Sequence, residues 1–141
     1  MTQEDKELLL KDLSARLPYG VKLGFYASAT KQTYICTLLG LEPQEDEPVI
    51  AKTENGSFYM LAGNVKPYLF PLSSMTEEQK KEYNYWKHEV PVCRYEYGDV
   101  VEEIELYDSP ESFEYLIENH FDYRGLIEKG FAIDATGKNI Y

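Results

Sequence analysis

The spacing of apolar residues changes from helical to strand-like between residues 17 and 21, and this change most constrains the fold of the chain. The first segment has four leucines at helical spacing: Leu9, Leu10, Leu13 and Leu17. After Pro18 and Gly20, the apolar residues Val21, Leu23 and Phe25 alternate with a period of two. The pattern predicts a helix over residues 3–16, capped by Thr2 and Asp5, and then a strand.

Further β-rich runs are separated by short turn signals, which predicts antiparallel hairpins. Residues 33–41 follow the first strand across a polar link, and residues 49–53 and 57–62 flank Asn55-Gly56, a pair suited to a tight turn. Gly98-Asp99 is expected at the centre of another hairpin, which pairs Tyr97 with Val100 and Cys93 with Ile104. One face of this hairpin is mostly apolar and is expected to be buried, and the other is mostly charged.

The remaining segments predict two more helices and their connections. A capping signal at Ser74 or Thr76 predicts a helix that runs to about residue 88. Asp108 or Ser109 is expected to cap the next helix, which has an apolar stripe of Phe113, Leu116, Ile117 and Phe121. Residues 65–72 contain two prolines and are expected to form an edge strand or linker, residues 43–48 an acidic loop, and residues 123–129 a turn of helix. We expect a single α+β domain over residues 1–141, an antiparallel sheet of two or three hairpins with about three helices packed on it.

Composition narrows the class of protein. The chain has 141 residues, 25 acidic against 14 basic, and a formal net charge of −11. Its apolar content is typical of a globular domain, and no uncharged run approaches the roughly 18 apolar residues of a membrane span. The acidic N-terminus is unlike a secretory signal, so we expect a cytoplasmic protein with both cysteines reduced and no membrane contact.

Few residues could support catalysis or metal binding. The candidates are His88, His120, Cys36 and Cys93, and none has a companion at metal-ligand spacing. His120 lies on the apolar stripe and is expected to be a core residue, His88 to be a surface residue, and the two cysteines to be small buried hydrophobes. Phosphate-binding, nucleotide-fold and common hydrolase motifs do not occur in the sequence. We therefore predict no catalytic residue, metal or cofactor.

The placement of charge is the most unusual feature of the sequence. Residues 95–118 contain no Lys or Arg and nine acidic residues: Glu96, Asp99, Glu102, Glu103, Glu105, Asp108, Glu111, Glu114 and Glu118. Like charges three and four residues apart slightly destabilise a helix, so helix stability does not explain this arrangement. Direct binding of nucleic acid is disfavoured, because neutralising phosphates needs clustered Lys and Arg.

Several functions remain compatible with this acidic window. It could serve solubility alone, or it could dock a basic protein partner and even imitate DNA phosphates toward a nucleic-acid-binding protein. We expect a non-enzymatic interaction protein whose binding surface comprises Glu103, Glu105, Glu111, Glu114, Glu118 and Tyr115. The alternatives are a small enzyme or ligand-binding domain with a site around His88 or His120, and a structural subunit of a phage-related assembly.

Three segments of the chain resemble a known group of proteins. They are residues 15–22 (ARLPYGVK), 66–79 (KPYLFPLSSMTEEQ) and 121–141 (FDYRGLIEKGFAIDATGKNIY). These segments resemble short uncharacterised proteins encoded in gut Bacteroidales genomes, often near phage or other mobile elements. The resemblance implies a bacterial, cytoplasmic setting, and it assigns no catalytic residue.

Overall fold

The chain forms two compact units. A computed structural model describes residues 2–41, 48–53 and 56–141. Unit 1 contains Met1–Ser74 and His120–Tyr141, and unit 2 contains Met75–Asn119. The expected acidic loop falls almost wholly outside the described residues. That one domain spans residues 1–141 stays a prediction.

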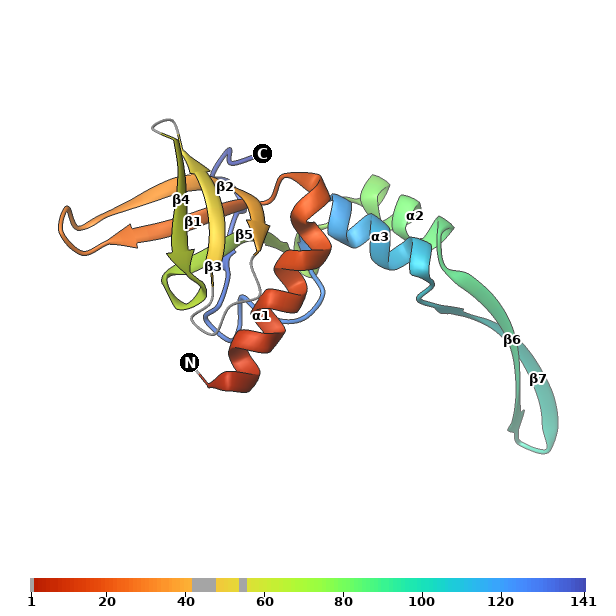
Figure 1. Cartoon of the computed structure of the whole chain (residues 1–141). Coiled ribbons are helices and arrows are strands. Elements are labelled where there is room, and N and C mark those ends of the chain that lie inside the picture. The colour runs from red at the N-terminus through yellow and green to blue at the C-terminus, as the bar shows by residue number, and fades with distance from the viewer. Residues whose placement is uncertain (1, 42–47, 54–55) are drawn as a thin grey trace. The chain divides into compact units, whose positions relative to one another are not determined.

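Unit 1 is built on one sheet, with the strand order β4-β3-β2-β1-β5-β8 and with β9 also paired to β5. Figure 1 labels strands β1 to β5 of this sheet. Its strands are β1 (Lys22–Ala27), β2 (Gln32–Leu41), β3 (Pro48–Thr53), β4 (Gly56–Leu61), β5 (Val65–Pro71), β8 (Phe121–Asp122) and β9 (Ile133–Asp134). The predicted β1–β2 and β3–β4 hairpins are both confirmed as antiparallel pairs. Short 3-10 helices cover Leu17–Tyr19, Ala62–Asn64 and Leu72–Ser74.

Helix α1 (Gln3–Arg16) has the predicted bounds and the predicted cap. The Thr2 hydroxyl accepts from the Asp5 backbone N–H, and the Asp5 carboxylate accepts from the Thr2 backbone N–H. Both bonds satisfy backbone donors that have no partner inside the helix. The buried face of α1 packs into the core of unit 1, which comprises Leu9, Leu13, Val21, Leu23, Cys36, Leu38, Val65, Leu69, Leu126 and Ala132.

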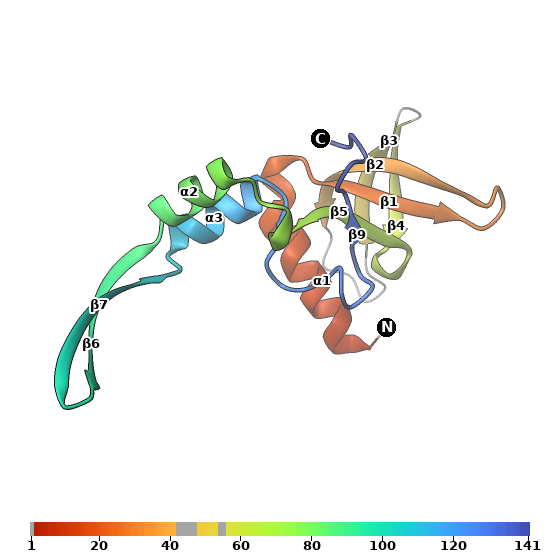
Figure 2. The same cartoon turned by 180° about the vertical axis from the view of Figure 1, so that it is seen from behind.

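Strand β5 corrects the prediction of an edge strand or linker over residues 65–72. Its neighbours in the strand order are β1 and β8, and it also pairs with β9, which lies beside it in Figure 2. The pairings with β8 and β9 are parallel. Proline lacks a backbone N–H, but Pro67 and Pro71 each occupy the last pair of their segment. An interior strand therefore tolerates both prolines, and the sheet is mixed and not purely antiparallel.

Unit 2 contains a helix, a long hairpin and a second helix. Its elements are α2 (Glu77–Tyr85), β6 (His88–Glu96), β7 (Asp99–Tyr107) and α3 (Pro110–Glu118). Capping boxes with Thr76 and Gln79, and with Ser109 and Ser112, begin the two helices. The predicted helix over residues 74–88 is shorter than expected, and His88 begins β6. The expected turn of helix over residues 123–129 consists of bends and hydrogen-bonded turns.

The β6–β7 hairpin exists as predicted, but its register differs by two residues. Tyr95 pairs with Val100, Cys93 with Glu102, and Glu96 with Asp99. The two turn residues are Tyr97 and Gly98, with φ angles of 53° and 85°. A two-residue turn with both φ angles positive matches the twist of the strands, and glycine adopts the second position without strain. The shift is an even number, so each side chain stays on its predicted face.

Both faces of the hairpin are open to solvent, and the prediction of a buried apolar face is wrong. Tyr95 is 85% exposed and Ile104 is 68% exposed, although they lie on the apolar face. Within unit 2, the ribbon extends away from α2 and α3 (Figure 1). Alternation of apolar and polar residues predicted the strands correctly, but alternation alone does not supply a second layer to cover one face. The α+β fold class itself is confirmed.

Candidate functional site

Unit 2 carries most of the net charge of the chain. It holds 13 of the 25 acidic residues and 4 of the 14 basic residues, a net charge of −9 out of −11. Unit 1 is therefore close to neutral. Charge separated in this way concentrates negative potential on α2, α3 and the hairpin, which form a small unit.

Helix α3 has an acidic exposed side and a buried side. Glu111, Glu114 and Glu118 are exposed, while the buried residues are Ser112, Tyr115, Leu116 and Ile117. Two members of the predicted apolar stripe lie elsewhere. Phe113 is partly exposed because the buried side follows Ser112 and Tyr115, and Phe121 belongs to β8 because the helix ends at Glu118.

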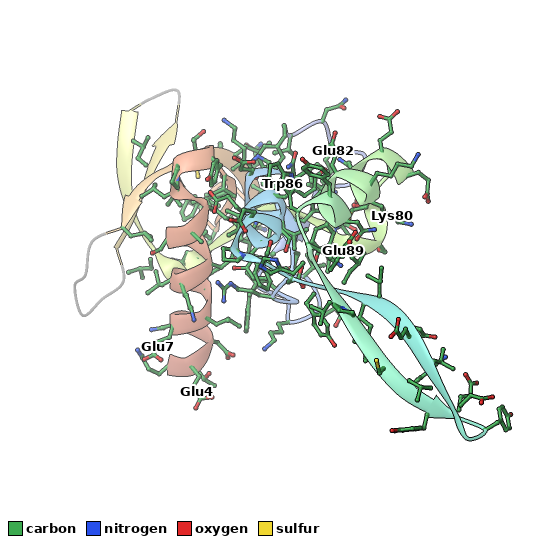
Figure 3. The ribbon with its side chains drawn as sticks, turned by 90° about the vertical axis from the view of Figure 1, so that its right-hand side faces the viewer. Glu4, Glu7, Lys80, Glu82, Trp86 and Glu89 are labelled. Atoms are coloured by element: carbon green, nitrogen blue, oxygen red, sulfur yellow. The ribbon has the colours of Figure 1, made fainter. Side chains whose placement is uncertain are left out.

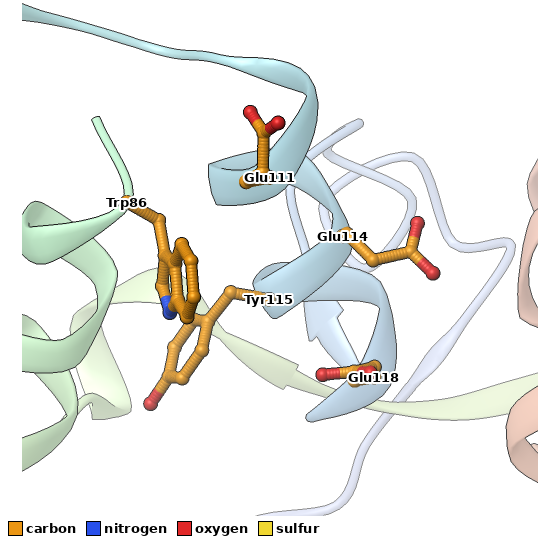
Figure 4. Close-up of a pocket in the computed structure, with 5 residues that line it drawn as sticks. All are labelled: Trp86, Glu111, Glu114, Tyr115 and Glu118. Carbon is orange, nitrogen blue, oxygen red and sulfur yellow. The ribbon is translucent and has the colours of Figure 1, made fainter. Parts of the chain in front are cut away.

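A groove lies along α3 at the end of α2. It is lined by Trp86, Glu111, Glu114, Tyr115 and Glu118 and has a volume of about 220 Å³. Figure 4 shows the indole and the phenol ring coming together beside α3, while the three carboxylates project from that helix. The groove therefore combines two aromatic rings with three acidic side chains.

Hydrogen bonds hold the aromatic side of this groove in place. The Ser109 hydroxyl, which caps α3, also donates to the backbone carbonyl of Trp86. The Tyr115 hydroxyl donates to Glu82 Oε2 at 3.0 Å. Burial and this contact with Glu82 raise the pKa of Tyr115 to about 12, so the phenol is a neutral donor at physiological pH.

A second ring extends this aromatic cluster away from the groove. The Tyr83 and Tyr115 rings are parallel within 3°, with centroids 6.3 Å apart. The Tyr83 hydroxyl donates to Asp108, and burial together with that carboxylate raises the pKa of Tyr83. Lys87 Nζ lies 4.3 Å from the centroid of the Tyr83 ring. This ring thus already holds a cation from its own chain.

Trp86 also borders a second hollow on the same unit. That hollow measures about 450 Å³ and is lined by Lys81, Glu82, Tyr85 and Trp86. Tyr85 meets the indole edge to face, with ring centroids 5.1 Å apart. Figure 3 shows Trp86 and Glu82 in the same helical region of the unit. Trp86 is 46% exposed, so the indole is accessible although it separates two hollows.

The structure separates the six predicted surface residues into two groups within unit 2. Glu111, Glu114, Glu118 and Tyr115 line the groove, and Tyr115 does so as a mostly buried ring that is 7% exposed. Glu103 and Glu105 lie on β7 and do not line the groove. Arg94 Nη2 lies 2.6 Å from Glu103 Oε1, and the Tyr107 hydroxyl donates to Glu105 Oε2.

The histidines and cysteines occupy four different environments. His88 is exposed at the start of β6, and Cys93 is exposed, which corrects its prediction as a buried hydrophobe. Cys36 is buried as predicted, and burial raises the pKa of its thiol. Neither histidine lines one of the two hollows described above.

His120 is a partly buried residue of unit 1. Its ring stacks on Tyr141 with centroids 3.7 Å apart, and its buried Nδ1 atom has no hydrogen-bond partner in the described residues. Burial and the nearby Arg16 and Lys22 lower the pKa of His120 to about 4. The imidazole is therefore neutral near pH 7, and it faces cations and an aromatic ring.

The sequence did not identify Trp86 as a site residue. Helix α2 ends at Tyr85, and Trp86 is its C-cap residue. The indole of Trp86 is exposed. Trp86 is the single tryptophan of the chain and lies shortly before the acidic residues of positions 95–118, and this proximity was the available signal.

Residues 2–41, 48–53 and 56–141 contain no group of three His, Cys, Asp or Glu side chains arranged to hold a metal ion. No helix among these residues is long and apolar enough to cross a membrane.

Comparisons with protein-family models, curated proteins and solved structures give no match for this chain. The function is therefore argued from the site itself.

Proposed function

We propose that the chain is a non-enzymatic interaction protein that docks a basic protein partner through unit 2. The acidic docking surface comprises Glu103, Glu105, Glu111, Glu114, Glu118 and Tyr115, together with Trp86 in the groove. The observation that carries the proposal is the groove, because it places three carboxylates beside two aromatic rings. Aromatic residues are enriched at protein interfaces, and complementary charge speeds association and selects the partner.

Two further features support this proposal over a role in solubility alone. A solvated acidic surface needs no aromatic side chains, yet Trp86, Tyr95, Tyr97 and Tyr107 are exposed on the same acidic unit. The net negative charge is also concentrated on unit 2, whereas solubility would be served equally by net charge spread over both units.

Charge reversal tests the proposal. The variant Glu111→Lys, Glu114→Lys, Glu118→Lys is compared with the matched variant Glu4→Lys, Glu7→Lys, Glu128→Lys, which makes the same change in net charge on exposed residues of unit 1. Affinity capture at low salt from a bacterial host lysate is expected to yield a basic protein with the wild type and the unit 1 variant. The groove variant is expected not to capture this basic protein. If the groove variant still captures every protein that the wild type captures, this surface is not the docking surface.

A further inference from the structure

We infer that the groove on α3 accepts an arginine side chain of the basic partner. This inference rests on the proposed function, because it names the residue by which the partner would be held. The guanidinium would lie against the half-exposed indole of Trp86, beside the largely buried Tyr115, in the groove that Glu111, Glu114 and Glu118 also line. The argument depends on the shape of the groove, on its unpaired charges and on the geometry of guanidinium.

Among the residues that the structure describes, no ion pair involves Glu111, Glu114 or Glu118. In the described part of the chain, the ion pairs between side chains lie elsewhere, on α1, α2, the β6–β7 hairpin and Arg124. Three exposed carboxylates on one helix face repel one another, and a bound cation relieves that repulsion. The groove therefore favours a positively charged occupant over a neutral or acidic one.

The aromatic side of the groove favours a flat cation. Trp86 presents an indole that is half exposed, and Tyr115 is fixed by its hydrogen bond to Glu82. A cation is attracted to the face of an aromatic ring, most strongly to tryptophan. Guanidinium is planar and weakly hydrated, so it stacks on such a ring and still donates two parallel hydrogen bonds to a carboxylate. The ammonium group of lysine can approach a ring, as Lys87 does at Tyr83, but it is compact and strongly hydrated and cannot lie flat on the ring while donating two parallel hydrogen bonds to a carboxylate.

The groove also has the scale of a single side chain. Its volume of about 220 Å³ is too small for a helix or strand of the partner. Tyr83 already has Lys87 of the same chain over its ring and Tyr115 is largely buried, so Trp86 is the ring of this cluster that a partner cation reaches. Arginine is one of the residue types that dominate binding energy at interfaces, which fits a role as the anchor of the partner.

The single tryptophan makes this inference directly measurable. Fluorescence excited at the long-wavelength edge of the indole band, where tyrosine does not absorb, reports on Trp86 alone. Titration with N-acetylarginine amide is expected to give a saturable change in emission with a dissociation constant on the order of 1 mM, as befits a ligand of this size. N-acetylcitrulline amide has the same shape without the charge and is expected to give no saturable change. N-acetyllysine amide with a free ε-ammonium is expected to bind at least about threefold more weakly than the arginine probe.

Two variants that lose the same charge show whether the arginine probe responds to the groove or to the overall negative charge of unit 2. Glu111→Gln, Glu114→Gln, Glu118→Gln is expected to weaken binding of the arginine probe about tenfold. Glu96→Gln, Asp99→Asn, Glu102→Gln removes the same charge from the hairpin and is expected to change the affinity less than about twofold. Thermal unfolding establishes that both variants are folded. Equal effects of the two variants would mean that the arginine probe responds to net charge and not to the groove.

The two proposals fail in distinguishable ways. If the arginine probe causes no saturable change, or if lysine and citrulline probes match it, the arginine assignment is overturned. Capture of a basic partner that still depends on Glu111, Glu114 and Glu118 would then leave the docking proposal standing. If capture is indifferent to charge reversal at these residues, the docking proposal fails whatever the arginine probe does.

Discussion

Asp12 and Arg16 on α1 form an ion pair that is fully removed from solvent. Arg16 Nε lies 2.8 Å from Asp12 Oδ2, both side chains are 0% exposed, and Arg16 also donates to the Phe121 carbonyl at 2.6 Å. Arg124 Nε lies 3.3 Å from the other Asp12 oxygen. The pair thus links α1 to β8 and to the turn directly after β8, across a sequence separation of 105 residues between Arg16 and Phe121.

Removing one partner of this pair is expected to be costly. Asp12→Asn leaves the Arg16 guanidinium buried without its counter-charge, and we expect a loss of about 3–5 kcal/mol in the free energy of unfolding. The double variant Asp12→Leu, Arg16→Met removes both charges and is expected to lose less than the single variant. Urea unfolding followed by circular dichroism measures both. A smaller loss in the single variant than in the double variant would contradict this account.

His120 is expected to make the protein less stable in mild acid. Its pKa is about 4 in the folded chain and about 6.5 when unfolded, so between these pH values the unfolded chain takes up a proton that the folded chain does not. Stability is therefore present above pH 6.5 and is lost as the pH falls toward 4. Because the ring is partly exposed, we expect a loss of about 1–2 kcal/mol between pH 7 and pH 5.

A matched pair of histidine variants isolates this effect. His120 has a φ angle of 62°, a conformation that asparagine tolerates well, so His120→Asn is the suitable change. Urea unfolding at pH 7 and pH 5 is expected to show a reduced pH dependence in His120→Asn and an unchanged one in His88→Asn. The exposed His88 serves as the control. If both variants keep the pH dependence of the wild type, His120 is not its source.

The β6–β7 hairpin is an element whose stability does not come from burial. We expect Ile104→Thr, at an exposed position of β7, to change the free energy of unfolding by less than about 0.5 kcal/mol. Leu116→Ala on α3 of the same unit removes a fully buried side chain and is expected to cost about 2–5 kcal/mol. Chemical denaturation of the isolated protein measures the free energy of unfolding of both variants. A large cost at Ile104 would mean that the apolar face of the hairpin is covered in solution.

The hairpin and β5 show which features of the fold could be predicted from the sequence. Caps and periodicity act locally, so α1 and the two hairpins of unit 1 were predicted within a few residues. The position of β5 depends on β8 and β9, which pair with it from the distant C-terminal segment. The two-residue shift in β6–β7 arose because Tyr97 adopts a positive φ angle that its residue type disfavours.

The acidic residues of the candidate site could be predicted from the sequence, but the groove that they line could not. Charge counting singled out Glu111, Glu114 and Glu118 because an acidic run is visible in the sequence. Trp86 joins them only because α2 ends at Tyr85 and the Ser109 cap of α3 bonds the Trp86 carbonyl. Such a contact links residues 23 positions apart and has no periodic signature.

At the scale of the whole molecule, unit 2 is an insertion between β5 and β8. The chain leaves unit 1 after Ser74 and returns at His120. Strand β8 pairs with the last two residues of β5, Phe70 with Phe121 and Pro71 with Asp122. Paired strands lie about 4.8 Å apart, so the two ends of unit 1 are close enough for a short linker to replace the insertion.

This topology predicts that unit 1 folds without unit 2. In a deletion variant, a linker of about six Gly and Ser residues joins Ser74 to His120 and replaces Met75–Asn119. We expect this variant to unfold cooperatively in urea, because the α1 and sheet core lies entirely within unit 1. It would also lose most of the negative charge and the capture of a basic partner. Loss of cooperative unfolding would instead show that residues 1–141 fold as the single domain predicted from the sequence.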